Sequence, residues 1–191
     1  MANLLILNTT IPYPLHHTGN TVRVLPLSRE LAKRHRCYLA TFGEADERYR
    51  ELAARHEYED ILLLPSFPTA HPWWRHFFWR TGNLIKRMHP GYYHECVTKL
   101  SAFADCHHID LVLAHTMEVS EFAEELPVAR KIVDVVDSRY LYLERRYTHP
   151  DPANSTLRGR LKAYRELARA RYQESRLLYH FALATTVSAR D

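Results

Sequence analysis

Short apolar runs alternate with longer, more polar segments along the whole chain. Runs such as 4–8 and 61–64 end at turn residues, which is typical of buried strands. The apolar runs predict six strands, at 4–8, 37–42, 61–64, 110–114, 131–136 and 182–187. The segments between them predict helices at 21–34, 44–56, 91–105, 117–125 and 156–179. Pro26 falls inside the first helix, so either this helix kinks there or it begins only near Pro26.

Continuous apolar strands separated by helices indicate a parallel sheet that is covered on both faces. The crossovers should be right-handed, which gives an α/β, doubly wound, Rossmann-like sheet of about six strands. A length of 191 residues suits a single domain over 1–191.

The composition indicates an ordinary globular protein but does not identify a binding partner. The chain is 46% hydrophobic and 25% charged with a net charge of +4, so it is an ordinary globular chain that permits anionic partners. Three cysteines without regular spacing fit a reduced, cytoplasmic protein. The sequence contains no apolar run of membrane-spanning length and no leader-like start. We therefore expect a cytoplasmic protein, either soluble or peripheral at the inner face of a membrane.

Ligands of such sheets bind outside the carboxyl ends of the strands, so the residues after each strand are the candidates. The loop 9–20 is long, and the helix after it would present free N–H groups to an anion. The candidates from this loop and helix for acceptor binding are Tyr13, His16, His17, Thr18, Gly19, Asn20 and Arg23. The alternative is an ordinary turn capped by Thr18 or Asn20. No dinucleotide fingerprint or Walker A loop is present.

Two further strand ends carry polar residues. His115 comes after the fourth predicted strand and could act as an acid, a base or a hydroxyl-binding group. Asp137 ends the fifth strand, followed by Ser138, and either binds substrate hydroxyls or caps the next helix. Asp134 lies within that apolar strand and therefore needs a polar partner. We predict no metal site, because His16–His17 and His107–His108 are adjacent pairs without ligand spacing.

Two segments combine basic and apolar residues. Residues 73–88 could form an aromatic helix that either packs on the domain or touches an anionic membrane. The helix 156–179 has a stripe that we expect to be buried and a basic face that we expect to be solvated. The members of the stripe are Leu157, Leu161, Tyr164, Ala168, Tyr172 and Tyr179. Nucleic-acid binding is disfavoured because the tyrosines lie away from the basic face.

Several of these motifs occur in an order that resembles one enzyme family. The segments 11–14, 18–24 and 31–35 resemble the opening of the family-four retaining glycosyltransferases, with its Pro-Tyr-Pro loop, glycine-rich turn and helix. The strand 110–115 is similar to the family's aspartate-to-histidine strand. Segments 131–138 and 174–188 resemble the exopolysaccharide branch, so the resemblance covers nearly the whole chain. Asn20 stands where the family usually has a second glycine.

The resemblance implies a GT-B fold of two Rossmann-like domains, of which this chain would be the N-terminal, acceptor-binding one. The missing C-terminal domain would bind a nucleotide-sugar donor without an essential metal, and the acceptor would be a sugar or glycolipid in polysaccharide or glycolipid biosynthesis. His115 and Asp137 are the expected catalytic residues, and Ser138 joins the acceptor-binding set. This chain alone is not expected to catalyse transfer. The alternative is a stand-alone Rossmann-like module that binds a nucleotide or a protein.

Overall fold

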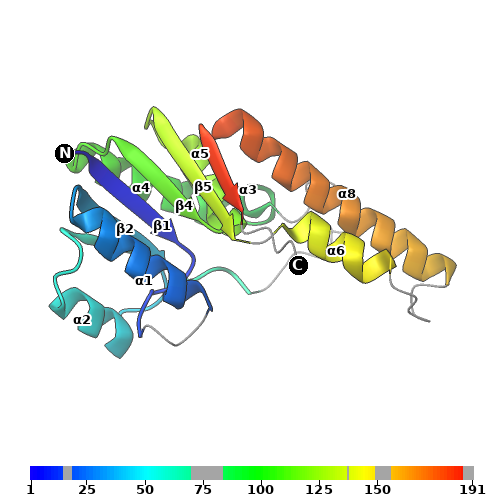
Figure 1. Ribbon diagram of the computed structural model, residues 1–191, viewed down its shortest axis with the longest axis horizontal. Coiled ribbons are helices and arrows are strands. Elements are labelled where there is room, and N and C mark those ends of the chain that lie inside the picture. Colours follow the sequence, from blue (N-terminus) through cyan, green and yellow to red (C-terminus); the bar gives the residue numbers. More distant parts are fainter. Residues whose placement is uncertain (15–18, 70–83, 137, 149–155, 187–191) are drawn as a thin grey trace.

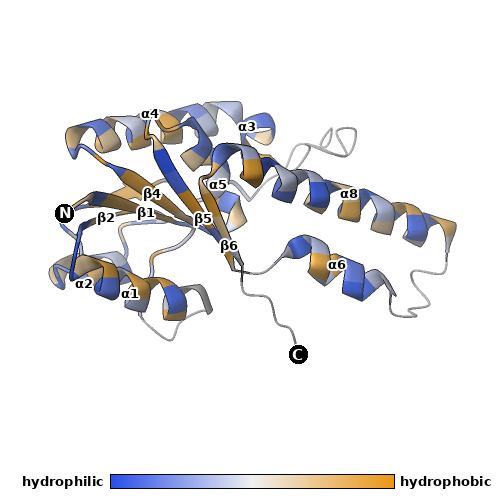
Figure 2. Ribbon diagram, turned by 45° about the horizontal axis from the view of Figure 1, so that its top comes forward, coloured by the Kyte–Doolittle hydropathy of each residue, from blue (hydrophilic) through white to orange (hydrophobic). Residues whose placement is uncertain are grey.

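The fold is a six-stranded, entirely parallel sheet between two layers of helices, seen in a computed structural model (Figure 2). The structure describes residues 1–14, 19–69, 84–136, 138–148 and 156–186. The elements in chain order are β1 (Asn3–Asn8), α1 (Gly19–Ala32), β2 (Arg36–Phe42), α2 (Glu47–Ala54), β3 (Ile61–Leu64), α3 (Ile85–Met88), α4 (Pro90–Cys106), β4 (Leu111–His115), α5 (Met117–Glu125), β5 (Arg130–Val136), α6 (Arg139–Thr148), α8 (Leu157–His180) and β6 (Leu183–Thr186).

The strand order is β3-β2-β1-β4-β5-β6, which confirms the doubly wound, Rossmann-like α/β class. The order reverses between β1 and β4, whose register pairs Asn8 with His115. In doubly wound sheets the crevice for ligands opens at this reversal, outside the carboxyl ends of the strands. The topology therefore directs attention to the ends of β1, β4 and β5.

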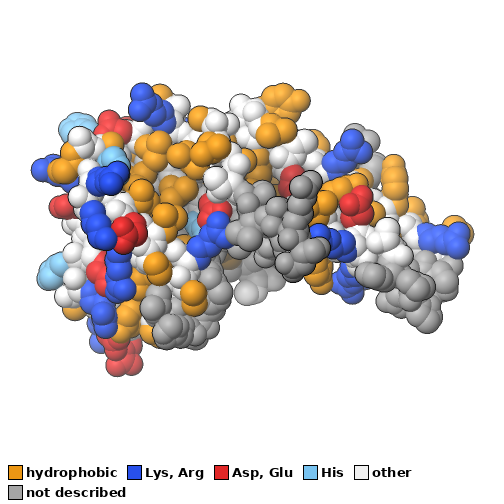
Figure 3. All heavy atoms as spheres, viewed as in Figure 1, with side chains coloured by type: hydrophobic (Ala, Val, Ile, Leu, Met, Phe, Trp, Pro, Cys, Tyr) orange, Lys and Arg blue, Asp and Glu red, His pale blue; other side chains and the backbone are white. Residues whose placement is uncertain are grey.

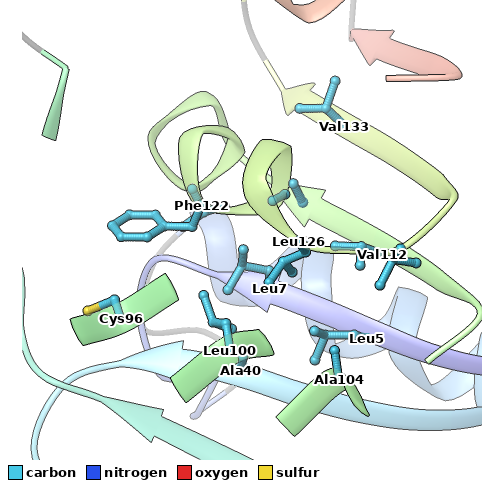
Figure 4. Close-up of a cluster of buried hydrophobic side chains, with 14 of the residues drawn as sticks. Leu5, Leu7, Ala40, Cys96, Leu100, Ala104, Val112, Phe122, Leu126 and Val133 are labelled. Atoms are coloured by element: carbon cyan, nitrogen blue, oxygen red, sulfur yellow. The ribbon is translucent and has the colours of Figure 1, made fainter. Parts of the chain in front are cut away.

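Alternate strand residues feed two separate cores. One set packs against α4, α5 and α8, and part of it is drawn in Figure 4, including Leu5, Leu7, Leu100 and Phe122. Each such side chain, fully removed from water, contributes roughly 1.5–3 kcal/mol of hydrophobic stabilisation. The other set, with Leu4 and Ile6, packs against α1 and α2 on the opposite face (Figure 2). Both faces are thus apolar, which explains why the strands are continuous apolar runs.

Helix α1 begins at Gly19 and runs through Pro26, which excludes the alternative of a helix that begins only near Pro26. The proline is exposed, so its ring lies on the solvent side of the helix. The carbonyl of Val22 loses its helical donor, and the exposed position of Val22 leaves water to replace it. The helix tolerates the proline because the break falls on its outer face.

Helices α6 and α8 lie side by side and extend together beyond the carboxyl edge of the sheet (Figure 1). The buried residues of α8 are Ala163, Ala170 and Leu177. The stripe that we expected to be buried is largely exposed, with Leu157 at 87% and Tyr179 at 85%. That prediction is wrong because α8 projects from the domain and buries only its narrow alanine-lined side.

The aromatic segment 73–88 falls mostly outside the described residues. Its last part is described, and there Leu84 and Met88 are buried at α3, which packs beside α4. Among the helices that the structure describes, none has the length and apolar content needed to cross a bilayer. The three cysteines are free thiols, with Cys37 and Cys96 buried and Cys106 exposed.

Candidate functional site at the carboxyl edge

A row of polar residues crosses the sheet near its carboxyl edge, on the face covered by α1. Thr41 of β2 is in register with Asn8 of β1, and Asn8 is in register with His115 of β4. His115 is in turn in register with Asp134 of β5, and Asp134 with Thr185 of β6. Register partners in a parallel sheet lie side by side on one face. We call these five residues the polar row.

The centre of the polar row is an ion-paired cluster around Asp134. One carboxylate oxygen lies 3.0 Å from Nδ1 of His115. The other oxygen accepts hydrogen bonds from Nη2 of Arg23 at 2.8 Å and from the Thr185 hydroxyl at 2.9 Å. Asp134 and His115 are 3% and 1% exposed, so water has little access to the carboxylate or the imidazole. The partner that a buried Asp134 requires is therefore His115 together with Arg23.

The surroundings fix the state of the His115 ring. Burial lowers the pKa of His115, and the Asp134 carboxylate opposes that shift only in part. The imidazole is therefore neutral near pH 7, and its proton lies on Nδ1, next to the carboxylate. The lone pair then belongs to Nε2. This atom is buried and has no hydrogen-bond partner among the described residues.

Two other members of the polar row also carry unused polar atoms. The Asn8 amide donates to the carbonyl of Thr10 at 2.6 Å, while its own carbonyl oxygen has no partner in the part of the chain that the structure describes. The same holds for the Thr41 hydroxyl. A buried polar atom without a partner costs free energy, so three of them in one row need an explanation. A ligand that supplies the missing bonds is one such explanation.

Thr116 follows His115 in a strained conformation. Its φ is 86°, which is rare for a β-branched residue, and its N–H donates to the Asp134 carbonyl at 2.8 Å. Strain of this kind is found at functional sites more often than elsewhere. Thr116 follows the fourth strand and belongs to the strand-end residues that the topology predicts as candidates. Sequence reasoning did not select Asn8 or Thr41, although both stand near strand ends, where polar residues interrupt apolar runs.

Tyr13, in the loop after β1, contacts Arg55 and not the Asp134 cluster. The Tyr13 hydroxyl accepts a hydrogen bond from Arg55 at 2.8 Å, and the guanidinium also lies 4.7 Å from the ring centre. Tyr13 therefore sits at the end of α2, apart from the Asp134 cluster. His16, His17 and Thr18 lie outside the described residues, and Gly19 and Asn20 form the first turn of α1. Of the predicted acceptor set, Arg23 is the member that joins His115.

Ser138 takes part in a separate network at the start of α6. Its hydroxyl accepts from the N–H of Leu141 at 3.1 Å and donates to Glu174 of α8 at 2.9 Å. Ser138 thus caps α6, a role that the sequence had left open for Asp137, which lies outside the described residues. Beside this cap is a hollow of about 490 Å³ lined by Ser138, Arg171 and Glu174 among others. A second hollow of about 510 Å³ adjoins it and shares Tyr140, Arg171 and Ser175.

Comparison with known proteins supports the fold. No protein-family model matches the chain, and no curated protein sequence is significantly similar. A UDP-glucosyltransferase from Polygonum tinctorium capable of glucosylating indoxyl has a similar structure, with a TM-score of 0.50, 12% identity, and coverage of 91% of this chain and 44% of that one. TcCGT1 in complex with UDP has a TM-score of 0.43 and 13% identity, over 79% of this chain and 34% of that one.

This likeness shows a glycosyltransferase-like Rossmann fold. The chain spans less than half the length of these solved proteins. Their identity to this chain is too low to transfer an activity or a substrate, so the function has to be argued from the polar row itself.

Proposed function

We propose that this chain is the acceptor-binding domain of a nucleotide-sugar-dependent glycosyltransferase of the family-four retaining type, acting in polysaccharide or glycolipid assembly. The proposal is supported by the strand order, by the glycosyltransferase-like fold, and by the motifs from 11–14 to 186–188. Because the chain covers 44% of the similar glucosyltransferase, a donor-binding domain would have to supply the nucleotide sugar. The chain alone would hold an acceptor without transferring a sugar to it.

The observation that carries the proposal is the free Nε2 of a neutral His115. Asp134 holds the opposite ring nitrogen at 3.0 Å, which fixes both the tautomer and the orientation of the ring. Arg23 and Thr185 hold the carboxylate, so it cannot rotate away from the imidazole. A histidine fixed in this way presents one hydrogen-bond acceptor that matches a sugar hydroxyl.

In this proposal an acceptor hydroxyl donates its hydrogen bond to His115 Nε2. As the hydroxyl oxygen bonds to the anomeric carbon of the donor sugar, the bond from that carbon to the nucleoside diphosphate breaks, and the diphosphate leaves with the electron pair. The hydroxyl proton moves to Nε2, and Asp134 stabilises the resulting positive charge on the imidazole. Asn8 and Thr41 offer unused oxygens on the same face for further hydroxyl groups. Asp137 remains the second proposed catalytic residue.

The partners follow from the same proposal. The acceptor would be a sugar or a glycolipid, the donor a nucleotide sugar on the other domain, and the reaction would take place in the cytoplasm or at the inner face of its membrane. No nucleic-acid partner is proposed.

The test is a histidine-selective NMR titration of the chain with oligosaccharides and glycolipid head groups. We expect the Nε2 resonance of His115 to shift on binding, and His115→Asn to abolish binding. Asparagine keeps a donor for Asp134 but lacks Nε2, so this variant separates the binding role from the structural one. His107→Asn is the matched control, because His107 pairs with Asp60 at 3.0 Å, away from the polar row.

Calorimetry with UDP-, GDP- and ADP-sugars provides the complementary measurement. An acceptor domain without its donor domain should show no micromolar site for any of them. Tight binding of a nucleotide sugar by the chain, with no response of His115 to any saccharide, would contradict the proposal and favour a stand-alone nucleotide-binding module.

A further inference from the structure

Helix α8 carries an exposed apolar stripe on the part that projects from the domain. Leu157 is 87% exposed, Leu161 58% and Tyr164 63%, although leucine and tyrosine at this spacing are usually buried. The three residues follow one another at steps of four and three, so they lie on one side of the helix. The buried residues Ala163 and Ala170 are out of phase with the stripe, so the covered side of the helix is a different one. Among the described residues, Leu157 and Leu161 are thus apolar side chains that remain mostly exposed.

Basic residues border the stripe on both sides. Arg158, Lys162 and Arg165 each follow a stripe residue by one position, and a single step turns about 100° around the helix. Arg160 comes one position before Leu161 and therefore lies on the other flank. Figure 3 shows Lys and Arg next to hydrophobic side chains along the arm formed by α6 and α8. The arrangement is that of an amphipathic helix with an apolar centre and a cationic border.

The acidic residues of α8 point toward α6 instead. Glu166 accepts a hydrogen bond from Tyr147, and Glu174 accepts from the N–H of Tyr140 at 2.8 Å. Together α6 and α8 hold ten Lys and Arg against three Glu, a net charge of +7, whereas the whole chain carries +4. The rest of the chain is therefore net negative, and the positive charge is concentrated on the projecting arm.

We propose that the exposed stripe of α8 and its basic borders dock the protein onto an anionic lipid bilayer. An apolar stripe with cationic flanks lets the leucines enter the acyl boundary while the arginines reach the lipid phosphates. Single-stranded nucleic acid stacks its bases on aromatic rings, whereas the first two residues of the stripe are leucines. A second copy of the chain would bring the same cationic borders face to face, which is repulsive. The proposal does not depend on the function proposed for the polar row.

The stripe side of α8 continues along the helix toward the domain. Tyr164 and Tyr172 line the hollow of about 510 Å³ along the middle of α8, which adjoins the hollow at Ser138. A protein held by Leu157 and Leu161 would therefore have these hollows on the membrane-docked arm. Leu157, the first residue of α8, lies at the end of the helix that projects from the sheet and is the most exposed of the three stripe residues (Figure 1).

The experiment is flotation of the chain with vesicles of phosphatidylcholine alone or with about one third phosphatidylserine. We expect the protein to float with the anionic vesicles and to be released by roughly 0.5 M salt, because salt screens surface charge. The variant Arg158→Glu/Lys162→Glu should lower the bound fraction by about tenfold or more. Leu157→Ser/Leu161→Ser should lower it by a similar factor, since it removes the apolar centre of the stripe.

A matched control distinguishes binding through the arm from an effect of net charge alone. Arg34→Glu/Arg50→Glu changes the charge equally, at exposed positions outside the arm, and should float like the wild type. Circular dichroism verifies that every variant is folded. The proposal is overturned if the wild type binds neither kind of vesicle, if both kinds bind it equally, or if the control loses as much binding as the arm variant. It is also overturned if Leu157→Ser/Leu161→Ser floats normally and instead abolishes self-association in sedimentation.

Discussion

Nδ1 of His115 lies 3.0 Å from a carboxylate oxygen of Asp134, and the two residues are register partners on neighbouring parallel strands. They are 19 residues apart in sequence, yet the sheet places them side by side. The contact depends on the backbone register of β4 and β5 and is therefore held as rigidly as the sheet itself. This rigidity suits a group whose ring orientation matters for a ligand.

Removing Asp134 should destabilise the fold strongly. Asp134→Ala leaves Arg23 and the His115 Nδ1 proton without their acceptor in a nearly water-free place. We expect a loss of about 3 kcal/mol in the free energy of unfolding, measured by urea denaturation. Glu30→Ala breaks a fully surface-exposed pair with Lys33 and serves as the control, with no measurable loss expected. Equal effects of the two substitutions would contradict a buried, mutually dependent cluster.

Stability should fall in mild acid because of His115. Burial lowers its folded pKa below the ordinary 6.5, so the unfolded chain takes up this proton at a higher pH than the folded chain does. The contribution to stability is present above 6.5 and is lost as the pH falls below it. His115→Asn should remove this part of the slope in urea midpoints measured from pH 5 to 8. If the slope is unchanged in His115→Asn, another group is responsible.

The structure also changes which His115 substitution is informative. His115→Ala is a mild change only if the ring at this strand end is exposed, but the ring is 1% exposed and bonded to Asp134. Alanine would leave a cavity and an unpaired carboxylate, at a cost of about 2–4 kcal/mol. A loss of activity in that variant would then be ambiguous, which is why His115→Asn is the better test of function.

The sheet could be predicted from the sequence because strands buried on both faces are continuous apolar runs. The predicted strand 110–114 begins and ends one residue before β4, which ends at His115 itself. The need of Asp134 for a partner could also be inferred from its place among valines. The identity of that partner could not, because it depends on the register between β4 and β5, which local patterns do not encode.

The orientation of α8 could not be predicted for a different reason. A stripe of leucine and tyrosine at helical spacing normally indicates burial, and the sequence does not say how far a helix extends beyond its sheet. The contacts of α8 are made through Ala163, Ala170 and Leu177, which a search for large apolar residues overlooks. The hydrogen bond of Ser138 could not be predicted either, because its acceptor, Glu174, lies 36 residues away in sequence.

The titration of Glu121 should make the folded chain less stable as the pH rises, which is opposite to the effect of His115. Burial raises its pKa to about 7, from an ordinary value of 4.5, and the N–H of Lys86 is a distant donor at 3.4 Å. The folded chain therefore holds a proton that the unfolded chain has released, and stability falls as the pH rises from about 4.5 to about 7. Glu121→Gln should remove this decline and raise stability at pH 8 by roughly 2–3 kcal/mol. Glu118 is exposed on the same helix, so Glu118→Gln should change neither the pH dependence nor the stability at pH 8. A gain of equal size in Glu118→Gln would contradict the assignment of the decline to Glu121.

The pairing of Ser138 with Glu174 should hold the start of α6 against α8. Glu174 accepts from the N–H of Tyr140 at 2.8 Å and from the Ser138 hydroxyl at 2.9 Å, and that hydroxyl accepts from Leu141. Ser138→Ala should cost about 1 kcal/mol and speed amide exchange across α6, because a helix cap is lost. Thr156→Ala removes the corresponding cap of α8, where the hydroxyl accepts from Gly159 at 3.0 Å, and should speed exchange only at the start of that helix. If Ser138→Ala leaves exchange in α6 unchanged while weakening saccharide binding, Ser138 acts on the acceptor and its capping role is secondary.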